Sequence, residues 1–398
     1  MEIIKPRTLS GFMELLPEKQ LKFDRMAEVL RKTYASYGFA PLDTPVIEDA
    51  QILLAKGGGE TEKQIYRFTK GDSDLSLRFD LTVPLAKYVA QHYGELTFPF
   101  RRFQIGKVYR GERAQRGRFR EFYQADIDVI GDGALDISNE AEIPSIIYRA
   151  FTALGLKRFQ IRVNNRKILN GFYAMLGLSQ QSGEIMRTVD KLDKIGPDKV
   201  AELLVQSGLS PEQAREILSF TSITGTNEEV LTALEGYRGR NEIFDQGLEE
   251  AEHGGPVSGG LRRPGGEFRR GPDHRPGPGL LHRHRLRDHP AGSPRDRLRL
   301  FRRPVRQSGG VLHGPPASRR GISIGLTRLF YVLGEQGMLN PDLPTAPADV
   351  LILPMTEDLS AAISLAILLR ETASAPSSTA RKEFKQKSPM PTSWASPM

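Results

Sequence analysis

Two neighbouring segments with the composition of β-strands constrain the fold of this chain more than any other feature. Residues 102–112 and 121–130 are rich in aromatic and β-branched side chains, and a glycine-containing loop joins them. Side chains of equal parity point to the same face of a strand. One face of the second segment therefore holds Gln124, Asp126 and Asp128, which alternate with apolar residues. This alternation predicts an antiparallel hairpin with one polar and one apolar face.

Polar faces also occur elsewhere in this half of the chain. Residues 77–82 repeat the alternation, with Asp80 and Thr82 on one face, and Arg110 shares a face with Glu112 in the first hairpin segment. One interpretation is a sheet with a solvated face, which is common. The other is a binding site for an amino acid and a nucleotide, because these faces mix carboxylates and arginines with an amide and a hydroxyl.

The loop between the two hairpin segments is rich in arginine. Four arginines surround Gly117, namely Arg113, Arg116, Arg118 and Arg120. Guanidinium groups at such a tip could hold a polyphosphate or contact RNA phosphates. A solvated basic hairpin tip would look the same, so the spacing leaves both interpretations open.

The rest of the chain predicts a mixture of helices and strands over two or three domains. We expect helices at 18–37 and 139–155, and an extended segment at 39–46. A strand is expected at 75–80. Residues 182–250 are mostly helical in pattern, and residues 347–370 favour a strand followed by a helix.

One block accounts for the basic character of the protein. Residues 253–320 hold 16 arginines and only four acidic residues, a net charge of +12, so the remainder of the +8 chain carries −4. The overall charge therefore does not support nucleic-acid binding. The block is also rich in glycine and proline, which is typical of a disordered linker.

The composition also limits the chemistry and the location. There are no cysteines, which excludes disulfides and thiolate metal sites. The N-terminus has no apolar signal segment, and no apolar run reaches the length of a membrane span. We therefore expect a cytoplasmic protein without a membrane partner.

Four segments together resemble the class II aminoacyl-tRNA synthetases in their histidyl form. Tyr109-Arg110-Gly111-Glu112 and Phe119 through Asp128 look like motif 2, and the segment from Gly38 to Pro45 is similar to motif 1, the dimer-interface element. Leu77 through Pro84 resembles the histidine-binding strand of that family, and Gly321 through Leu329 resembles motif 3. The resemblance covers about residues 5–250 and 321–370.

The resemblance implies a role for each matching residue. Arg110 would contact the α-phosphate of ATP and the carboxylate of histidine, Glu112 would accept from the adenine amino group, and Phe122 would stack on adenine. Arg118 and Arg328 would hold the outer phosphates, with Arg110 and Arg328 as the catalytic arginines. The histidine site would comprise Asp80, Leu81, Thr82, Arg110, Gln124 and Asp128.

The implied reaction needs no nucleophilic side chain. The histidine carboxylate attacks the α-phosphate of ATP, and the resulting histidyl-adenylate transfers histidine to tRNA(His). Positioning and charge neutralisation would carry the rate. Mg²⁺ would be held mainly by the ATP phosphates and one or two carboxylates. The family also implies a homodimer.

One expected motif is missing from its place. The family has a second histidine-binding string, Arg-Gly-Leu-Asp-Tyr-Tyr-Thr-Gly, between the helical insertion and motif 3. Residues 275–288 (RPGPGLLHRHRLRD) can be written in codons whose one-base offset spells Ala-Arg-Gly-Leu-Asp-Tyr-Tyr-Thr-Gly. We therefore interpret 251–320 as the product of a shifted reading frame, expect it to be disordered, and expect no metal site from its histidines. Residues 388–398 can be read in the same way.

The expected fold is α+β, with a class II synthetase antiparallel sheet of six or seven strands and flanking helices. We expect a catalytic core with motifs 1 and 2 at 1–181, a helical insertion at 182–250, the out-of-frame segment at 251–320, motif 3 at 321–340, and a truncated α/β anticodon-binding domain at 341–398. Because the arginine-bearing string is missing, histidine–tRNA ligation by this literal chain should be impaired.

Two alternatives stay open at this point. The first is the non-catalytic, synthetase-like regulatory subunit of ATP phosphoribosyltransferase, which shares the catalytic fold but lacks the second motif and the C-terminal domain. The second is a paralogue that binds histidine or RNA without ligation. The intact motif 2 residues Arg110 and Glu112, and the presence of the helical insertion, argue for the synthetase.

Overall fold

A computed structural model describes most of the chain in two compact units, Met1–Thr345 and Ala346–Met398. The described residues are 5–55, 62–136, 138–156, 159–161, 165–260, 285–287, 298–299, 317–339, 346, 348–355 and 357–374. None of the helices within these ranges is long and apolar enough to cross a membrane.

The predicted hairpin forms the centre of the first unit. Strands β5 (Phe100–Tyr109) and β6 (Glu121–Asp132) pair antiparallel, and β10 (Ala317–Gly325) pairs antiparallel with the other side of β6. The short edge strand β1 (Ala40–Pro41) runs parallel to β5, so the order is β1-β5-β6-β10. The described part of this sheet thus has four strands, fewer than the six or seven that we expected.

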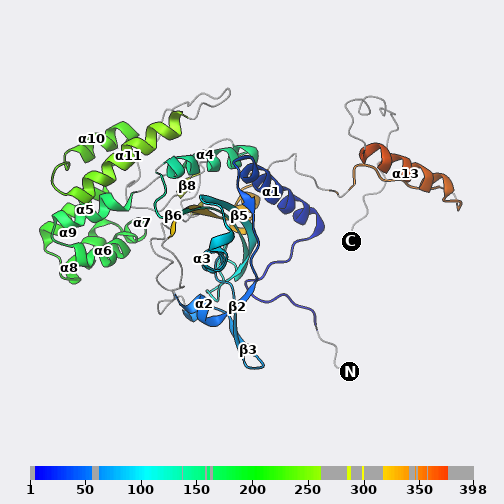
Figure 1. Cartoon of the computed structure of the whole chain (residues 1–398), viewed down its shortest axis with the longest axis horizontal. Helices are drawn as coiled ribbons and strands as arrows, with labels where there is room; N and C mark the ends of the chain where they lie inside the picture. The colour runs from blue at the N-terminus through cyan, green and yellow to red at the C-terminus, as the bar shows by residue number, and fades with distance from the viewer. Residues whose placement is uncertain are drawn as a thin grey trace. The chain divides into compact units, whose positions relative to one another are not determined.

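One face of the central sheet is covered by helices (Figure 1). Helices α1 (Pro17–Ser36), α4 (Ser138–Ala153) and α12 (Leu326–Glu335) bury apolar side chains against the alternate residues of the strands. Ile127 on β6 and Ile322 on β10 lie opposite each other in this core. The predicted helices at 18–37 and 139–155 are therefore confirmed, as is the apolar face of the hairpin.

A second, three-stranded sheet leads the chain to the opposite, polar face. Its order is β2-β4-β3, formed by β2 (Ile47–Asp49), β3 (Arg67–Lys70) and β4 (Ser73–Leu77). The short helix α2 (Ala50–Leu54) and the 3₁₀ turn Glu62–Gln64 lie in the connection between β2 and β3.

The strand predicted at 75–80 ends earlier than we expected. It stops at Leu77, and the chain turns into helix α3 (Thr82–Gln91), followed by the 3₁₀ turn Tyr93–Glu95. The prediction that 77–82 is a strand with one polar face was therefore wrong. The physical reason is Asp80, whose Oδ1 accepts from the backbone N–H groups of Thr82 (2.9 Å) and Val83 (3.0 Å), which favours a helix start.

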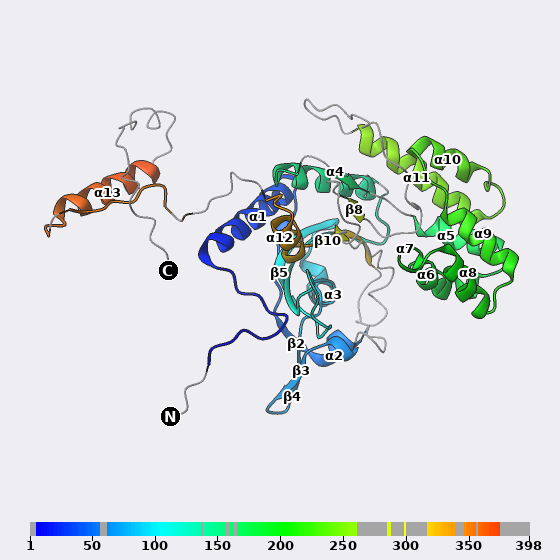
Figure 2. The same ribbon diagram turned by 180° about the vertical axis from the view of Figure 1, so that it is seen from behind.

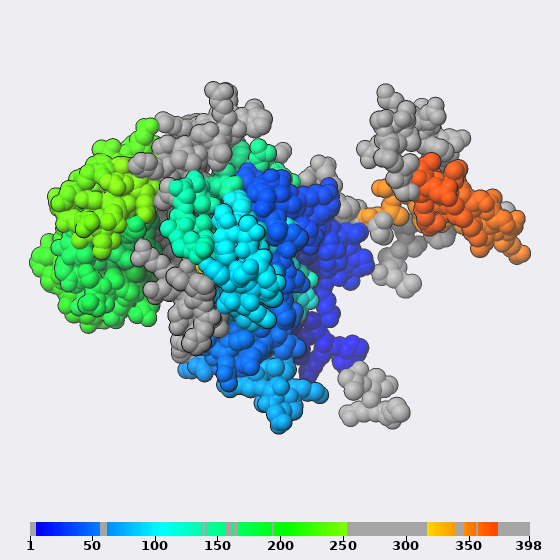
Figure 3. Space-filling model, viewed as in Figure 1, coloured from blue at the N-terminus to red at the C-terminus, as the bar shows by residue number. Residues whose placement is uncertain are grey.

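The helices from Arg166 to Gly260 share a hydrophobic core of their own. They are α5 (Arg166–Met175), the 3₁₀ turn Ser179–Gln181, α6 (Ser182–Val189), α7 (Leu192–Ile195), α8 (Pro197–Gln206), α9 (Pro211–Thr221), α10 (Asn227–Glu235) and α11 (Glu242–Gly260). Phe172 stacks on Phe220 with ring centroids 3.9 Å apart, and Phe244 packs beside them. Figure 3 shows these helices, coloured green, gathered into one body. This body includes α5, which precedes the start that we expected at residue 182.

The described pieces of the arginine-rich block are regular. Helix α11 continues to Gly260, β8 (Arg285–Arg287) pairs with β7 (Gln160–Ile161) and with β9 (Leu298–Arg299), and β10 begins at Ala317. Our expectations of a shifted frame and of disorder fall mostly on residues outside the described ranges. Strand β10, however, includes the last four residues of the predicted out-of-frame segment.

The second unit is described over residues 346–374, with gaps. Helix α13 (Ser360–Ser374) confirms the expected helix, whereas residues 348–355 form no strand. Leu351, Leu353 and Met355 are exposed there. A strand needs a partner for its backbone groups, and no described residue supplies one. Figure 2 shows α13 as the described helix of this unit.

The packing of α5 against α11 depends on glycine. A Cβ at Gly171 would lie 2.6 Å from Cα of Phe244, so the two helices leave no room for a side chain. Gly171→Ala should lower the free energy of unfolding by about 1–3 kcal/mol through overpacking. Gly183→Ala on α6 is the matched control, because a Cβ there meets no atom within 4 Å. Urea titration of both variants tests this. Equal losses of stability in the two would contradict it.

Candidate active site

The polar face of the central sheet carries a buried carboxylate between two guanidinium groups. Arg102 on β5 and Gly321 on β10 both lie opposite Asp128 on β6. Asp128 is fully buried, and its Oδ2 lies 2.6 Å from Nη2 of Arg102, which is equally buried. From β10, Arg319 Nε donates to Asp128 Oδ1 at 2.5 Å, and Arg319 Nη2 contacts the same oxygen. The Arg102 Nη2 also donates to the carbonyl of Leu81 at 3.0 Å, which ties the turn before α3 to the sheet.

A glycine is required opposite this carboxylate. A Cβ at Gly321 would collide with the carboxylate of Asp128 and with the carbonyl oxygen of Ile127. The glycine thus lets the side chain of Asp128 lie against the backbone of β10, within reach of Arg319 on the same strand.

The next row across the sheet is also polar. Gln104, Asp126 and Ser323 lie side by side on β5, β6 and β10. Asp126 is 1% exposed, and burial raises the pKa of its carboxyl to about 7. In the following row Gln124 Nε2 donates to the hydroxyl of Ser323 at 2.6 Å. The predicted polar face of 121–130 is therefore confirmed as a buried face, and not as a solvated one.

The turn before α3 is held in place by Arg78, which follows the last residue of β4 and contacts β5 of the central sheet. Arg78 is 2% exposed and its Nε donates to the carbonyl of Lys107 at 2.7 Å. Its Nη1 donates to the carbonyl of Thr44. A Cβ at Gly106 would lie 2.6 Å from Arg78 Nη2, so the glycine makes room for this guanidinium. Arg78 thereby fixes the segment that brings Asp80 and Thr82 over the polar face.

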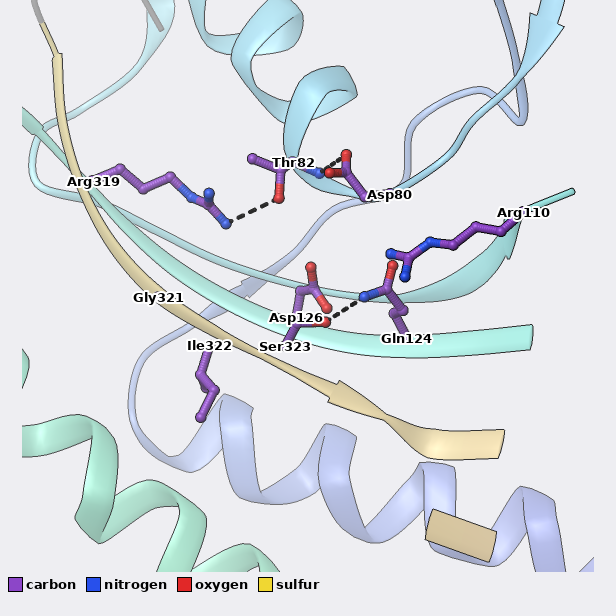
Figure 4. A pocket seen from close by; sticks show the side chains of 9 residues that line it. All are labelled: Asp80, Thr82, Arg110, Gln124, Asp126, Arg319, Gly321, Ile322 and Ser323. Carbon is purple, nitrogen blue, oxygen red and sulfur yellow. Dashed lines mark hydrogen bonds between the residues drawn. The ribbon is translucent and has the colours of Figure 1, made fainter. Parts of the chain in front are cut away.

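These elements enclose a small pocket with a volume of about 60 Å³. It is lined by Asp80, Thr82, Arg110, Gln124, Asp126, Arg319, Gly321, Ile322 and Ser323. Figure 4 shows Arg319 reaching from β10 to Thr82, with Arg110 on the opposite side. Three buried atoms of the lining find no hydrogen-bond partner among the described residues: Gln124 Oε1, Asp126 Oδ1 and Arg319 Nη1. Buried polar atoms are normally paired, so these atoms indicate a polar ligand.

Arg110 lies just beyond the end of β5, between two aromatic rings. Its guanidinium carbon is 4.5 Å from the ring centroid of Phe79 and 5.1 Å from that of Phe122. Its Nε donates to the carbonyl of Phe79 at 3.2 Å. Arg110 is therefore held at the pocket while it also covers Phe122.

The arginine-rich loop lies outside this lining. Arg118 Nη1 is 3.5 Å from Glu112 Oε2, and Arg116 pairs with Glu335 on α12. Arg328 lies in the first turn of α12, directly after β10, and is partly exposed. The start of α12 is fixed by Thr327, whose hydroxyl accepts from the backbone N–H of Tyr123 at 2.8 Å.

The structure gathers part of the predicted site. Asp80, Thr82, Arg110 and Gln124 line one pocket, and Asp128 lies directly behind it, bound to Arg319. Leu81 is fully buried and contributes its carbonyl to Arg102. The remaining predicted residues, Glu112, Arg118, Phe122 and Arg328, do not line this pocket.

Sequence reasoning missed several residues that line the pocket or lie behind it. Arg102 and Arg319 gave no signal by spacing alone. Asp126 could have been found from the sequence, because its position places it on the same strand face as Gln124 and Asp128. Among the described residues, no group of three or more histidines or carboxylates is placed to hold a metal ion.

The raised pKa of Asp126 predicts a pH-dependent stability. Between about pH 4 and pH 7 the folded protein keeps a proton on Asp126 that the unfolded chain has released. The stabilisation of the folded protein by this proton is complete below the pKa of Asp126 in the unfolded chain. The free energy of unfolding then falls by about 1.4 kcal/mol per pH unit as the pH rises to 7. In Asp126→Asn this loss should be absent. The difference in unfolding free energy between wild type and variant, measured from pH 4 to 8, checks it. A difference that does not change with pH would contradict the assignment.

Known proteins similar to this chain give a consistent picture. The model of the Histidyl-tRNA synthetase family matches residues 11–253. The chain is 45% identical to the histidine–tRNA ligase of Clostridium tetani over 377 residues, which are 93% of this chain and 84% of the relative.

Solved structures agree at the level of the fold. The crystal structure of histidyl-tRNA synthetase from Nostoc sp. PCC 7120 matches with a TM-score of 0.77 and 32% identity, over 93% of this chain and 85% of that one. A structure described as an ATP phosphoribosyltransferase regulatory subunit/histidyl-tRNA synthetase from Bacillus halodurans matches with a TM-score of 0.70. It is only 19% identical, over 94% of this chain and 92% of that one, and therefore shows the α+β class II fold alone. The family match over most of the chain, together with the 45% identical relative, shows that this chain belongs to the histidyl-tRNA synthetase family.

Proposed function

We propose that the pocket on the polar face of the central sheet is the histidine site of a histidine–tRNA ligase. The observation that supports this most is the set of unpartnered atoms on Gln124 and Asp126, beside Asp80 and Thr82. Carboxylate, amide and hydroxyl oxygens are suitable acceptors for the ammonium of an amino acid. Arg110, on the other side of the same pocket, is suited to its carboxylate.

ATP binds beside this pocket in the proposal. Arg110 lies over Phe122, so an adenine stacked on that ring has its α-phosphate within reach of the guanidinium. Glu112 accepts from the adenine amino group, and Arg118 and Arg328 hold the outer phosphates. Mg²⁺ would be held mainly by the ATP phosphates and one or two carboxylates, and it would neutralise part of the phosphate charge.

The chemistry follows from this arrangement. A carboxylate oxygen of histidine attacks the α-phosphorus, the bond to the β-phosphate oxygen breaks, and pyrophosphate leaves. The 3′ end of tRNA(His) then takes the histidyl group, and AMP leaves. Arg110 neutralises charge on the reacting oxygens, so its contribution is electrostatic. The chain acts in the cytoplasm as a homodimer, through the segment around β1, where Val46 and Ile47 are exposed.

The reaction should be slow in this chain. The expected arginine-bearing string is missing from the sequence, and Asp128, which would bind histidine, is engaged by two arginines. A variant with residues 251–320 replaced by the reading of the alternative frame should exchange pyrophosphate faster. A near-normal rate in the unaltered chain would refute this part of the proposal.

Arg110 offers the direct test. In histidine-dependent ATP–pyrophosphate exchange, Arg110→Ala should lower the rate by about 10²-fold or more, as removal of one transition-state donor does elsewhere. Arg110→Lys should not restore it, because an ammonium cannot contact two oxygens in one plane. Arg215→Ala, an exposed arginine on α9 that pairs with Glu212, is the control and should leave the rate unchanged. Unchanged exchange in Arg110→Ala would remove the proposed role.

The same assay separates the alternative function. A non-catalytic regulatory subunit would show no histidine-dependent exchange at all, in either reading frame, and would instead change the activity of ATP phosphoribosyltransferase when the two are mixed. Arg110 and the Glu112–Arg118 pair argue for the ligase, because a regulatory subunit does not need groups for ATP phosphates and adenine.

A further inference from the structure

Arg319 has a position that the resemblance did not assign. Its guanidinium reaches from β10 into the pocket and binds Asp128 and the hydroxyl of Thr82, the latter at 3.3 Å. Both are residues that the proposed function gives to histidine. Arg319 lines the pocket, and its third nitrogen, Nη1, is buried without a hydrogen-bond partner among the described residues. The guanidinium thus lies within the pocket (Figure 4).

Two arginines contact the carboxylate of Asp128, and they differ in how deeply they are buried. Arg102 is already within 2.6 Å of Asp128 Oδ2, and both side chains are fully buried. That pair alone is neutral, which is the condition for burying a charge at moderate cost. Arg319 adds a second cation to the same carboxylate, and its side chain is 11% exposed. Of the two arginines, Arg319 is therefore the one that another cation can replace.

The space beside Arg319 is small for an amino acid with a ring. The pocket holds about 60 Å³, whereas a cavity that binds benzene has a volume of about 150 Å³. The guanidinium of Arg319 is a planar cation with several N–H donors, and protonated imidazole shares these properties. The side chain therefore resembles, in charge and hydrogen-bonding capacity, the group that the carboxylate of Asp128 would receive from histidine.

We propose that Arg319 occupies the part of the pocket beside Asp128 and Thr82 where a cationic group of histidine would bind, and that it acts as an internal competitor of histidine. The proposal rests on the proposed function for the identity of the ligand. Histidine can bind only when the guanidinium of Arg319 leaves Asp128 and Thr82, so part of the binding free energy is spent on displacing it. Arg319 thereby weakens the affinity of this chain for its amino acid.

Truncation of Arg319 tests this directly. Arg319→Ala should bind L-histidine at least about tenfold more tightly than the unaltered chain in titration calorimetry without ATP or tRNA, a gain of ~1.4 kcal/mol. Guanidinium chloride at low millimolar concentration should compete with histidine in Arg319→Ala, because it refills the vacated place. It should have no such effect on the unaltered chain.

Two further variants keep the result interpretable. Arg320→Ala removes the same charge from the neighbouring residue, which points to the other face of β10, and should leave histidine binding unchanged. Arg319→Met keeps most of the aliphatic stem but has no guanidinium, so it should also bind histidine more tightly. Arg319→Met decides the matter if Arg319→Ala fails to fold. If the folded Arg319 variants bind histidine equally or more weakly, the proposal is overturned. That result would favour a direct contact between Arg319 and the bound histidine.

The outcomes distinguish this inference from the proposed function. If Arg319→Ala gains guanidinium-sensitive histidine binding but shows no pyrophosphate exchange with ATP, the subsite stands and the ligase function fails. If the unaltered chain exchanges pyrophosphate and Arg319→Ala binds histidine no more tightly, the function stands and the internal competitor fails.

Discussion

The buried carboxylate of Asp128 is the constraint on which the central sheet depends. A charge without solvent must be neutralised at short range, and Arg102 from one neighbouring strand and Arg319 from the other do so. Arg102, Asp128 and Gly321 lie in one row across three strands, and Arg319 reaches Asp128 from two residues before Gly321. The third position of that row must be glycine, because any side chain at Gly321 would collide with Asp128. A shift of β10 by one residue would send Arg319 to the apolar face, so the ion pairs also fix the register.

Much of the fold could be predicted from local pattern. The hairpin of β5 and β6 followed from alternation, and α1 followed from an apolar stripe, because each of these signals lies within one element. The prediction failed where a single side chain decided the backbone. Asp80 ends the extended segment by accepting from the first two backbone N–H groups of α3. Residues 348–355 lack a described partner strand, although their composition favours a strand.

The site was only partly predictable, for a related reason. Gln124, Asp126 and Asp128 follow one another at strand spacing, so their common face could be read from the sequence. Arg102 and Arg319 come from strands far apart in sequence, and only the pairing of β5 and β10 with β6 brings them to Asp128. The resemblance to the family named the groups that recognise the ligand. The resemblance did not assign Arg319, whose guanidinium contacts two of these groups, Asp128 and Thr82.

The coupling between Asp128 and Arg102 organises the central sheet, and a double-mutant cycle measures this coupling most directly. The free energy of unfolding is compared for the unaltered chain, Arg102→Met, Asp128→Asn and the double variant. Asp128→Asn should lose about 3–5 kcal/mol, because it leaves the fully buried Arg102 without its carboxylate, and Arg102→Met should lose less, because Asp128 keeps Arg319. The double variant should lose much less than the sum of the two, which gives a large coupling energy. Additive losses would contradict the claim that this buried pair organises the sheet and the pocket on it.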